Sequence, residues 1–344
     1  MATMKSVLSG GKNEIEVVEV ERPAPGPKDA LVRIRACGIC GTDTFFVHMG
    51  GTPYNNPDGS VVPLPLGHEP AGEVVEVGAE VTDLKVGDRV VVNPQGAPSG
   101  IIGCGGELGG MNEYLLIEDA VLGESVAVFP DELPFDVAAL NEPMAVARHC
   151  VNRSGAKPAD KVVVFGAGPI GLGATIWLKL RGVEHVVVAD VIPERLETAL
   201  AVGADAVIDS RNEDVTARLT ALHGQAANAL GQPRPGTDTY IDAAGVPAVF
   251  QAVVDAAKWN AKLVMVAVQK KSDAIDLGGM LRSELTLIAS QGYPTEIFEV
   301  TAELAAHKDR FAKLISHRVP FSEVDRAFEL ALTPGAAEKV VVTF

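Results

Sequence analysis

Cys40, His68 and Glu69 have side chains that bind zinc well, and glycines stand beside them in the sequence. Cys40 lies in the stretch Cys-Gly-Ile-Cys-Gly-Thr-Asp at residues 37–43, and the His-Glu pair directly follows Gly67. A thiolate, an imidazole and a carboxylate on short glycine-flanked segments can approach a single ion. Three protein ligands leave a fourth position open, so this pattern predicts a catalytic metal site.

A second pattern, at residues 162–171, is typical of dinucleotide binding. The sequence Val-Val-Val-Phe-Gly-Ala-Gly-Pro-Ile-Gly follows an apolar strand and opens a helix. The first glycine permits the tight turn, the second lets the backbone approach a pyrophosphate, and the third lets helix and strand pack closely. The expected cofactor-binding residues of this turn are Gly166, Gly168, Pro169, Ile170 and Gly171.

Asp190 ends the next apolar strand and is expected to accept hydrogen bonds from the ribose hydroxyls of the cofactor. Its carboxylate would repel a 2′-phosphate, and Val191 and Ile192 bring no compensating charge. The pattern therefore favours NAD over NADP. The alternative is a glycine-rich turn in a doubly wound domain that binds no nucleotide.

The two patterns lie in parts of the chain that differ in periodicity. Residues 5–132 contain short alternating runs, among them 30–35, 72–77 and 88–92, which predict a small antiparallel, barrel-like domain. From 161 to 289, strand-like and helix-like runs alternate, which predicts a parallel sheet covered on both faces. The predicted strands are 161–165, 186–189, 206–208, 239–243, 263–268 and 285–289, and the predicted helices are 170–180, 194–201 and 247–258.

The last part of the chain is expected to complete the first domain. It contains a helical run at 296–306, an amphipathic run at 322–332 and a strand at 339–344. The stretch 223–238, rich in Gly, Pro and Gln, is predicted to be a long loop. The fold class is thus α/β, with domains expected at 1–150 and 151–287 and with 288–344 returning to the first domain.

The composition limits which binding partners and which cellular compartment we expect for this protein. A formal net charge of -16 argues against nucleic acid or an anionic membrane, because either would need a basic face. The sequence has no apolar run of the roughly 18 residues that a membrane span needs and no recognisable signal peptide, so we expect a cytoplasmic protein. Its cysteines are expected to be free thiols; they are Cys37, Cys40, Cys104 and Cys150.

With both motifs present, the chain resembles the zinc-dependent medium-chain alcohol and polyol dehydrogenases, most of all their butanediol, sorbitol and threonine dehydrogenase branch. The resemblance runs almost the whole length and is carried by residues 40–43, 67–69, 86–90, 109–114, 142–147, 166–171 and 338–342. It implies a GroES-like β-rich catalytic domain and a doubly wound (Rossmann) cofactor domain. It also implies a small-molecule alcohol or ketone substrate and a homo-oligomer, either a homodimer or a homotetramer.

The resemblance also implies a ligand set. Residues matching Cys40 and His68 hold the catalytic zinc in that branch, and those matching Glu69 and Glu142 serve as third ligand, water-holding partner or alternates. A cap on the following helix is the structural alternative for Glu142. Cys37 imitates a CxxC pair, but no second pair completes four ligands, so it is predicted to fill the core.

Two further roles come from the same resemblance. Thr42 matches the position that receives the alcohol proton, and Arg195 matches a position over the adenine, where a guanidinium can stack. A hydrogen bond within its own turn is the alternative for Thr42, and a solvated helix face is the alternative for Arg195.

The chain departs from that family at two places. Most members of the branch carry a lobe with four cysteines that binds a structural zinc, whereas residues 94–110 here contain only Cys104. Four thiolates cannot come from one, so we expect one catalytic zinc and no structural zinc. Phe45 stands where relatives place the histidine that ends the proton relay. His48 is the nearby candidate for that role, and a structural role is the alternative for a lone histidine in an aromatic segment.

Substrate specificity is less constrained. The segment 45–65, which includes Tyr54, resembles a loop that borders the substrate cleft in butanediol-type enzymes, and Tyr293 follows a glycine where sorbitol enzymes carry arginine. These features favour a secondary alcohol or vicinal diol and its ketone. A polyol or threonine-type dehydrogenase is the nearest alternative, and a metal-free enone reductase or an inert NAD-binding sensor would have no use for Cys40 and His68 together.

Overall fold

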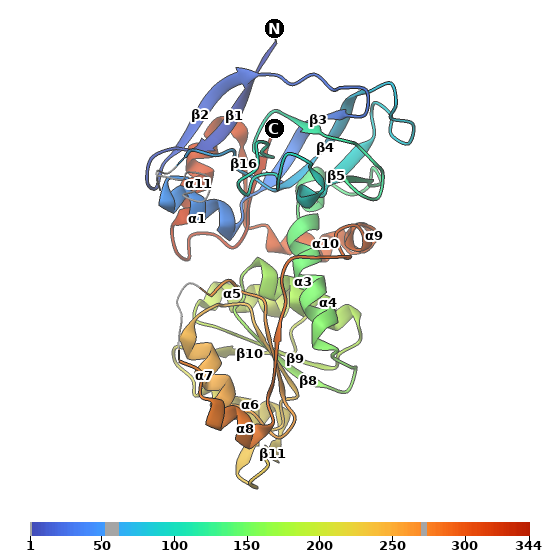
Figure 1. Ribbon diagram of the computed structural model, residues 1–344. Helices are drawn as coiled ribbons and strands as arrows, with labels where there is room; N and C mark the ends of the chain where they lie inside the picture. The colour runs from blue at the N-terminus through green and yellow to red at the C-terminus, as the bar shows by residue number, and fades with distance from the viewer. Residues whose placement is uncertain (1, 52–61, 270–273) are drawn as a thin grey trace. The chain divides into compact units, whose positions relative to one another are not determined.

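The computed structural model describes residues 2–51, 62–269 and 274–344, and its chain forms two compact units (Figure 1). Unit 1 comprises Met1–Glu142, Ile297–Lys308 and Ile315–Phe344, and unit 2 comprises Pro143–Glu296 and Asp309–Leu314. The C-terminal part thus returns to the unit that the N-terminal part builds. The domain boundaries given above remain a prediction.

Unit 1 is built on a mainly antiparallel sheet, with one parallel strand pair, and a separate hairpin. Its strands are β1 (Thr3–Ser9), β2 (Ile15–Glu21), β3 (Ala30–Gly38), β4 (Glu69–Val77), β5 (Arg89–Val92), β6 (Tyr114–Ile117), β7 (Val126–Val128), β16 (His317–Pro320) and β17 (Val340–Thr343). Its helices are α1 (Gly41–Met49), α2 (Phe135–Ala138), α9 (Glu299–Ala306) and α11 (Val324–Leu332), with short 3-10 turns at Pro94–Gly96 and Phe321–Glu323. Two helices cross from one unit to the other, α3 (Asn141–Ser154) and α10 (Lys308–Phe311).

Strand β3 is the centre of the unit 1 sheet. The strand order is β16-β17-β3-β4-β5-β7, with β6 also paired to β3, and β1 pairs with β2. Val32, Ile34 and Cys37 of β3 are buried in a cluster with Leu66 and Phe328. Burial of these apolar side chains stabilises the sheet and fixes which residues follow the end of β3.

Unit 2 is a parallel sheet of the doubly wound type, which confirms the predicted fold class. Its strands run in the order β10-β9-β8-β13-β14-β15, the two-halves order of dinucleotide-binding domains. They are β8 (Lys161–Phe165), β9 (His185–Asp190), β10 (Ala206–Asp209), β13 (Thr239–Asp242), β14 (Lys262–Met265) and β15 (Thr286–Ala289). The helices are α4 (Pro169–Leu180), α5 (Pro193–Ala201), α6 (Val215–His223), α7 (Pro247–Ala256) and α8 (Leu277–Ser283), with a 3-10 turn at Ala312–Leu314.

The predicted loop at 223–238 is wrong in part. His223 ends α6, and two short strands, β11 (Gln225–Ala227) and β12 (Pro233–Pro235), form an antiparallel hairpin within that stretch. The side chain of Asn228 accepts hydrogen bonds from the backbone amides of Leu230 and Gln232, both at 3.0 Å. An Asn side chain that satisfies the turn lets a Gly- and Pro-rich stretch form a hairpin.

Helix α1 was also absent from the sequence prediction, which assigned Phe45 to a loop. The backbone amide of Cys40 donates to Asp43 Oδ2 at 2.8 Å, and Gly50 ends the helix with φ 83. Because the residue at the N-cap is a cysteine rather than Ser, Thr, Asp or Asn, the usual start signal is missing from the sequence. Within the described ranges, none of the helices is long and apolar enough to cross a membrane.

Candidate metal centre and cofactor turn

Three neighbouring strands of unit 1 bring the candidate metal ligands together. In the antiparallel register, Gly38 at the end of β3 lies opposite Glu69 at the start of β4, and also opposite Val341 of β17. Cys40 follows β3 directly, and His68 directly precedes β4. Sheet pairing therefore places residues distant in sequence at one point, as the spacing of the motifs predicted.

The resulting group contains Cys40, His68 and Glu69. One potential ligand atom from each of the three lies within 4.8 Å of the other two, and this is the one such group among the described residues. His68 is 4 % and Glu69 is 1 % exposed, while Cys40 is half-buried. A thiol, an imidazole and a carboxylate at this separation form a donor set that suits zinc with an open fourth position.

Asp43 holds the two ligand-bearing segments together. Its Oδ2 accepts from the Cys40 amide at 2.8 Å, and its Oδ1 accepts from the Gly67 amide at 2.9 Å. The same Oδ1 lies 3.6 Å from His68 Nδ1. A buried carboxylate beside the imidazole fixes the ring orientation, as expected for a residue that supports a metal ligand.

Glu69 forms a buried ion pair with Lys339, the residue directly before β17. The Glu69 Oε2 and Lys339 Nζ atoms are in direct contact, and both side chains are at most 2 % exposed. Lys339 Nζ also donates to the Ile39 carbonyl at 2.9 Å. A Cβ on Gly38 would lie 1.8 Å from Glu69 Oε2, so only glycine leaves room for the carboxylate here. The Glu69 side chain therefore has little freedom.

The electrostatics of this group suit a cation. Burial lowers the pKa of His68, but the negative charges of Asp43 and Cys40 outweigh burial and raise it well above its usual value. Burial likewise opposes the charged form of Lys339, and the charges of Glu69, Cys40 and Glu142 raise its pKa. Glu69 Oε1 is buried and has no hydrogen-bond partner among the described residues. An excess of negative donors with an unpartnered oxygen is the arrangement that a divalent ion would complete.

Glu142 and Thr42 both lie in unit 1, but only Thr42 is shown in contact with one of the three candidate ligands. The Thr42 hydroxyl is 3.9 Å from the Cys40 sulfur. Glu142 lies in the first turn of α3 and is 9 % exposed, but the group of three does not include its carboxylate. Of the two candidate third ligands, the described geometry puts Glu69 with Cys40 and His68.

The residues expected to border the substrate do not form one cluster in unit 1. Phe45 is in α1 and is 44 % exposed. His48 is exposed at the opposite end of α1 from Cys40, and its Nδ1 lies 2.8 Å from Asn13 Oδ1. It is thus about 9 Å along the helix from Thr42, too far for a direct relay. Tyr54 lies outside the described residues, and Tyr293 is buried in unit 2.

The glycine-rich turn of unit 2 has the geometry that its sequence predicts. Gly166 has φ 94, and a Cβ on Gly171 would lie 1.8 Å from the Gly166 carbonyl oxygen. Gly168 is the N-cap of α4 without a side-chain cap, and a Cβ there would meet nothing within 4 Å. The helix N-terminus therefore has free backbone amides and open space, which suits a phosphate.

Asp190 is fixed by the backbone at the end of β9. Its Oδ2 accepts from the Ala167 amide at 2.6 Å, and its Oδ1 accepts from the Val191 and Ile192 amides at 2.7 and 2.9 Å. Arg195 is half-buried on α5. These bonds hold the Asp190 carboxylate beside the glycine-rich turn.

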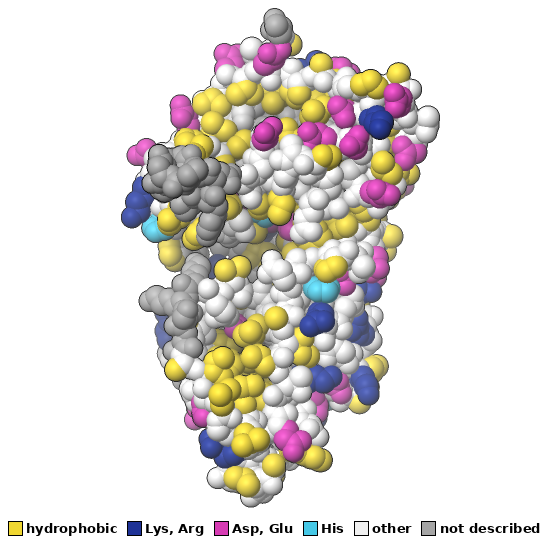
Figure 2. All heavy atoms as spheres, viewed as in Figure 1, with side chains coloured by type: hydrophobic (Ala, Val, Ile, Leu, Met, Phe, Trp, Pro, Cys, Tyr) yellow, Lys and Arg dark blue, Asp and Glu magenta, His cyan; other side chains and the backbone are white. Residues whose placement is uncertain are grey.

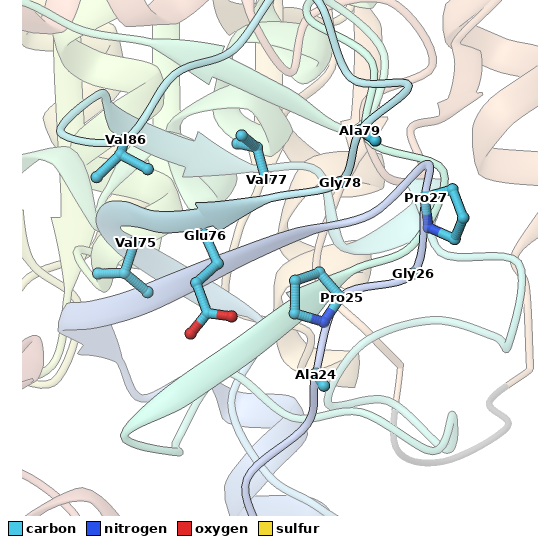
Figure 3. Close-up of a pocket in the computed structure, with 10 residues that line it drawn as sticks. All are labelled: Ala24, Pro25, Gly26, Pro27, Val75, Glu76, Val77, Gly78, Ala79 and Val86. Atoms are coloured by element: carbon cyan, nitrogen blue, oxygen red, sulfur yellow. The ribbon is translucent and has the colours of Figure 1, made fainter.

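A shallow surface groove of unit 1 does not look like a second site. It is lined by residues 24–27, 75–79 and Val86 (Figure 3). Its one titratable lining side chain, Glu76, pairs with Arg22. Acidic side chains spread over the face of unit 1 drawn in Figure 2, in keeping with the net charge of -16. Among the described lining residues, the groove therefore has a single carboxylate, which is already paired, and no cluster of metal donors.

Sequence reasoning missed two residues of the metal group. Asp43 was part of the first motif, and its position three residues after Cys40 is the signal of a capping carboxylate. Lys339 was part of the last motif, but nothing local in the sequence connects it with Glu69. Only the pairing of β17 with β3 does so.

Comparisons with known proteins agree with these features. The alcohol dehydrogenase GroES-like domain family matches residues 26–125, and the zinc-binding dehydrogenase family matches residues 169–307. The chain is 31% identical to (R,R)-butanediol dehydrogenase of Bacillus subtilis (strain 168), over 98% of this chain and 99% of that protein. It is 32% identical to L-galactonate-5-dehydrogenase of Escherichia coli (strain K12), over 96% and 95% of the two chains.

A solved structure extends the comparison to the fold. A zinc-binding dehydrogenase from Sinorhizobium meliloti 1021 bound to NADP matches with a TM-score of 0.83 and 30% identity, covering 100% of both chains. The predicted GroES-like and doubly wound parts are confirmed by these matches.

Proposed function

The chain belongs to the zinc-dependent medium-chain dehydrogenase family, and we propose that it transfers hydride between NAD and a secondary alcohol or vicinal diol, forming the ketone reversibly. It is an alcohol or polyol dehydrogenase by family. The observation that carries the proposal is the buried group of Cys40, His68 and Glu69, with a Glu69 oxygen that lacks a hydrogen-bond partner in the described structure. The relatives named for butanediol and galactonate dehydrogenation support the substrate class.

Cys40, His68 and Glu69 would hold the zinc, with Glu142 as an alternate carboxylate. Zinc supplies Lewis acidity, which makes a bound alcohol acidic enough to lose its proton near neutral pH. Asp43 orients His68, and Lys339 holds the Glu69 carboxylate in place. The Thr42 hydroxyl, beside the Cys40 sulfur, would accept the alcohol proton. Because His48 is bound to Asn13 at the far end of α1, the proton would then leave through the cofactor ribose and water.

The cofactor would bind at the turn of unit 2. Gly166, Gly168 and Gly171, with Pro169 and Ile170, would hold the pyrophosphate at the start of α4. Asp190 would bind the ribose hydroxyls and disfavour a 2′-phosphate, which supports NAD. The NADP-bound relative makes this a point to test. Arg195 would stack on the adenine.

We further propose one zinc per chain and a homodimer or homotetramer. Residues 94–110 contain a single cysteine, which cannot form a four-thiolate site. Strand β15 is an edge strand of the unit 2 sheet, and exposed apolar side chains lie on the neighbouring α8, including Leu277 at 70% and Leu281 at 78%. An open strand edge beside apolar surface favours association. For the domains, we retain 1–150 as catalytic, 151–287 as cofactor-binding and 288–344 as completing the first.

Metal content and turnover test the proposal together. We expect about one zinc per chain and reduction of NAD, but little of NADP, with 2,3-butanediol or a simple secondary alcohol in a screen that also holds sorbitol, threonine and inositol. Protein that holds no zinc after purification without chelators, yet turns over, would refute the metal role. Zinc and NAD binding without any turnover would instead support an inert cofactor sensor.

A further inference from the structure

Cys104 is a second thiol beside the metal-binding group, and the proposed function gives it no role. It lies between Gly103 and Gly105, whose φ angles are 69 and 99. The Cys104 thiol is half-buried, whereas Cys37 and Cys150 are fully buried. Cys104 is thus partly accessible to solvent, as is Cys40, the thiol of the proposed metal centre.

The loop that carries Cys104 packs directly against the peptide that carries His68. A Cβ on Gly103 would lie 2.1 Å from the Gly67 carbonyl oxygen and 3.0 Å from the His68 amide nitrogen. The Gly110 amide donates to the same Gly67 carbonyl at 2.7 Å. Only glycine permits an approach this close, so the backbone fixes where Cys104 lies relative to His68.

The side chains of the two segments also influence each other. Cys104 and His68 lie near enough for each to act on the pKa of the other, and the charges of Cys40 and Asp43 act on both groups. Cys104 also packs against the apolar core of unit 1. Thiols from two different segments therefore approach the same imidazole.

Burial shows which side of the group is open. Asp43, Glu69 and Lys339 are 0%, 1% and 2% exposed, so they close the inner side. Cys40 and Cys104 are both half-buried. Three protein donors would leave one position of a tetrahedral zinc for a further ligand, and Cys104 is a half-buried thiol whose loop packs against the His68 peptide.

We propose that Cys104 is a fourth protein ligand of the metal when no substrate is bound, and that the substrate oxygen displaces it. The proposal rests on the metal centre of the proposed function. Thiolate is among the ligands that zinc binds best. The thiol releases its proton to solvent on binding and takes one up on release. Because Cys104 lies outside the compact group of three donors, its side chain must move toward them when the ion binds.

Substitution of Co²⁺ for zinc tests this ligand without relying on turnover. A thiolate bound to Co²⁺ gives a sulfur-to-metal charge-transfer band in the near ultraviolet, whose intensity reports the number of thiolates. We expect the band of the full-length protein to fall by about half in Cys104→Ser and in Cys104→Ala, and Co²⁺ affinity to fall about tenfold or more. Adding 2,3-butanediol to the wild type should lower the band toward that of the variants.

Cys37→Ala is the matched control, because Cys37 also lies close to the metal group, with its sulfur 3.0 Å from a Cβ built on Gly67. This variant should keep the wild-type band. Unchanged bands in both Cys104 variants, with one Co²⁺ per chain, would overturn the Cys104 ligand and leave the metal centre intact. Wild-type protein that binds no Co²⁺ would overturn the metal centre and this ligand with it. The serine and alanine variants both lack the thiolate, so a lost ligand should weaken the band equally in the two. A folding defect is expected to differ between a polar and an apolar replacement.

Discussion

The candidate metal-binding carboxylate of unit 1 and two buried carboxylates of unit 2 are bound in different ways. In unit 1, Glu69 and His68 keep buried atoms without hydrogen-bond partners in the described structure, and both belong to the candidate metal centre. In unit 2, the Asp190 carboxylate accepts three backbone amides, and the Asp242 carboxylate accepts the Ala244 and Gly245 amides and the Gln269 side chain. Glu69 thus keeps an oxygen without a hydrogen-bond partner in the described structure, whereas backbone amides hold Asp190 and Asp242 in place.

This difference separates two ways of building a binding site. A site for a metal ion needs side-chain donors that the fold leaves unsatisfied, and such donors destabilise the chain until the ion arrives. A site for a dinucleotide pyrophosphate uses backbone amides at a helix N-terminus, so its side chains can stay satisfied. Gly168, with open space beside a helix N-terminus, is an example of the second kind of site in this chain. The closely packed pair of Glu69 and Lys339 is an example of the first.

The largest expected effect is on the donor group of unit 1. Cys40→Ser should abolish zinc binding and lower kcat by at least about a thousandfold, because several kcal/mol of Lewis-acid stabilisation is lost. Zinc per chain and the rate of NAD reduction are the measurements. Cys150→Ala, a thiol of unit 2, is the control and should keep both. Turnover that survives Cys40→Ser would remove the metal from the mechanism.

The second largest effect is expected on stability, at the buried ion pair of Glu69 and Lys339. Lys339→Met should lower the free energy of unfolding of chelator-treated protein by about 3–5 kcal/mol, since it leaves the Glu69 carboxylate buried without a counter-charge. The double variant with Glu69→Gln should recover most of this loss. Circular dichroism during urea unfolding of the four proteins completes a double-mutant cycle. A coupling energy near zero would show that the pair is not formed.

A smaller effect concerns a neutral buried group of unit 2. His223 is 1 % exposed, and burial, helped by the positive charges of Lys161 and His185, lowers its pKa from 6.5 to about 4. Below pH 6.5 the His223 side chain binds a proton in the unfolded chain, whereas in the folded chain it stays neutral until the pH approaches 4. Stability is therefore fully present above pH 6.5 and falls as the pH drops toward 4, by roughly 3 kcal/mol at most.

Tryptophan fluorescence can follow this loss, because both tryptophans, Trp177 and Trp259, lie in unit 2. In urea unfolding, the free energy of unfolding of the wild type should be lower at pH 4.5 than at pH 7.5. The same difference should be smaller in His223→Gln. His307→Gln, which changes an exposed residue of unit 1, serves as the reference. Equal pH dependence in wild type and His223→Gln would contradict the assignment.

The smallest expected effect is on a residue that supports the metal ligands. Asp43→Asn keeps the shape of the side chain but removes the charge that faces His68 and weakens the bonds to the Cys40 and Gly67 amides. Zinc affinity should fall about 10- to 100-fold, or roughly 1.4–2.8 kcal/mol. Competition with a coloured chelator measures it. Asp242→Asn is the counterpart in unit 2, and an equal loss there would mean that the effect is not local.

Local patterns were sufficient for much of the fold. The unit 2 strands at 161–165 and 206–208 and the helices at 170–180 and 194–201 were predicted to within one or two residues, because apolar runs, glycines and prolines mark their ends. Helix α1 was missed because its first turn is capped by a cysteine and a back-bonded aspartate. The hairpin at β11 and β12 was missed because the turn depends on one Asn side chain.

The candidate site shows the same limit more clearly. The grouping of Cys40, His68 and Glu69 could be predicted because each motif carries a glycine that allows close approach. The contact of Glu69 with Lys339 could not, because it depends on the register of β17 against β3, and register is a property of the assembled sheet. From the sequence, Cys104 was predicted to be a free thiol that cannot form a four-thiolate site, whereas in the fold its loop packs against the peptide of His68.

The bond between Lys339 and the Ile39 carbonyl has a consequence for the timing of synthesis, since it joins residues 300 positions apart. At the roughly 5–20 residues per second of translation, about 15 to 60 s pass between the emergence of the two. During that interval the nascent chain already holds Cys40, His68 and Glu69 but lacks the lysine that neutralises the glutamate. A metal ion captured early by the growing chain would supply that missing positive charge, so zinc supply during translation is expected to raise the yield of folded protein.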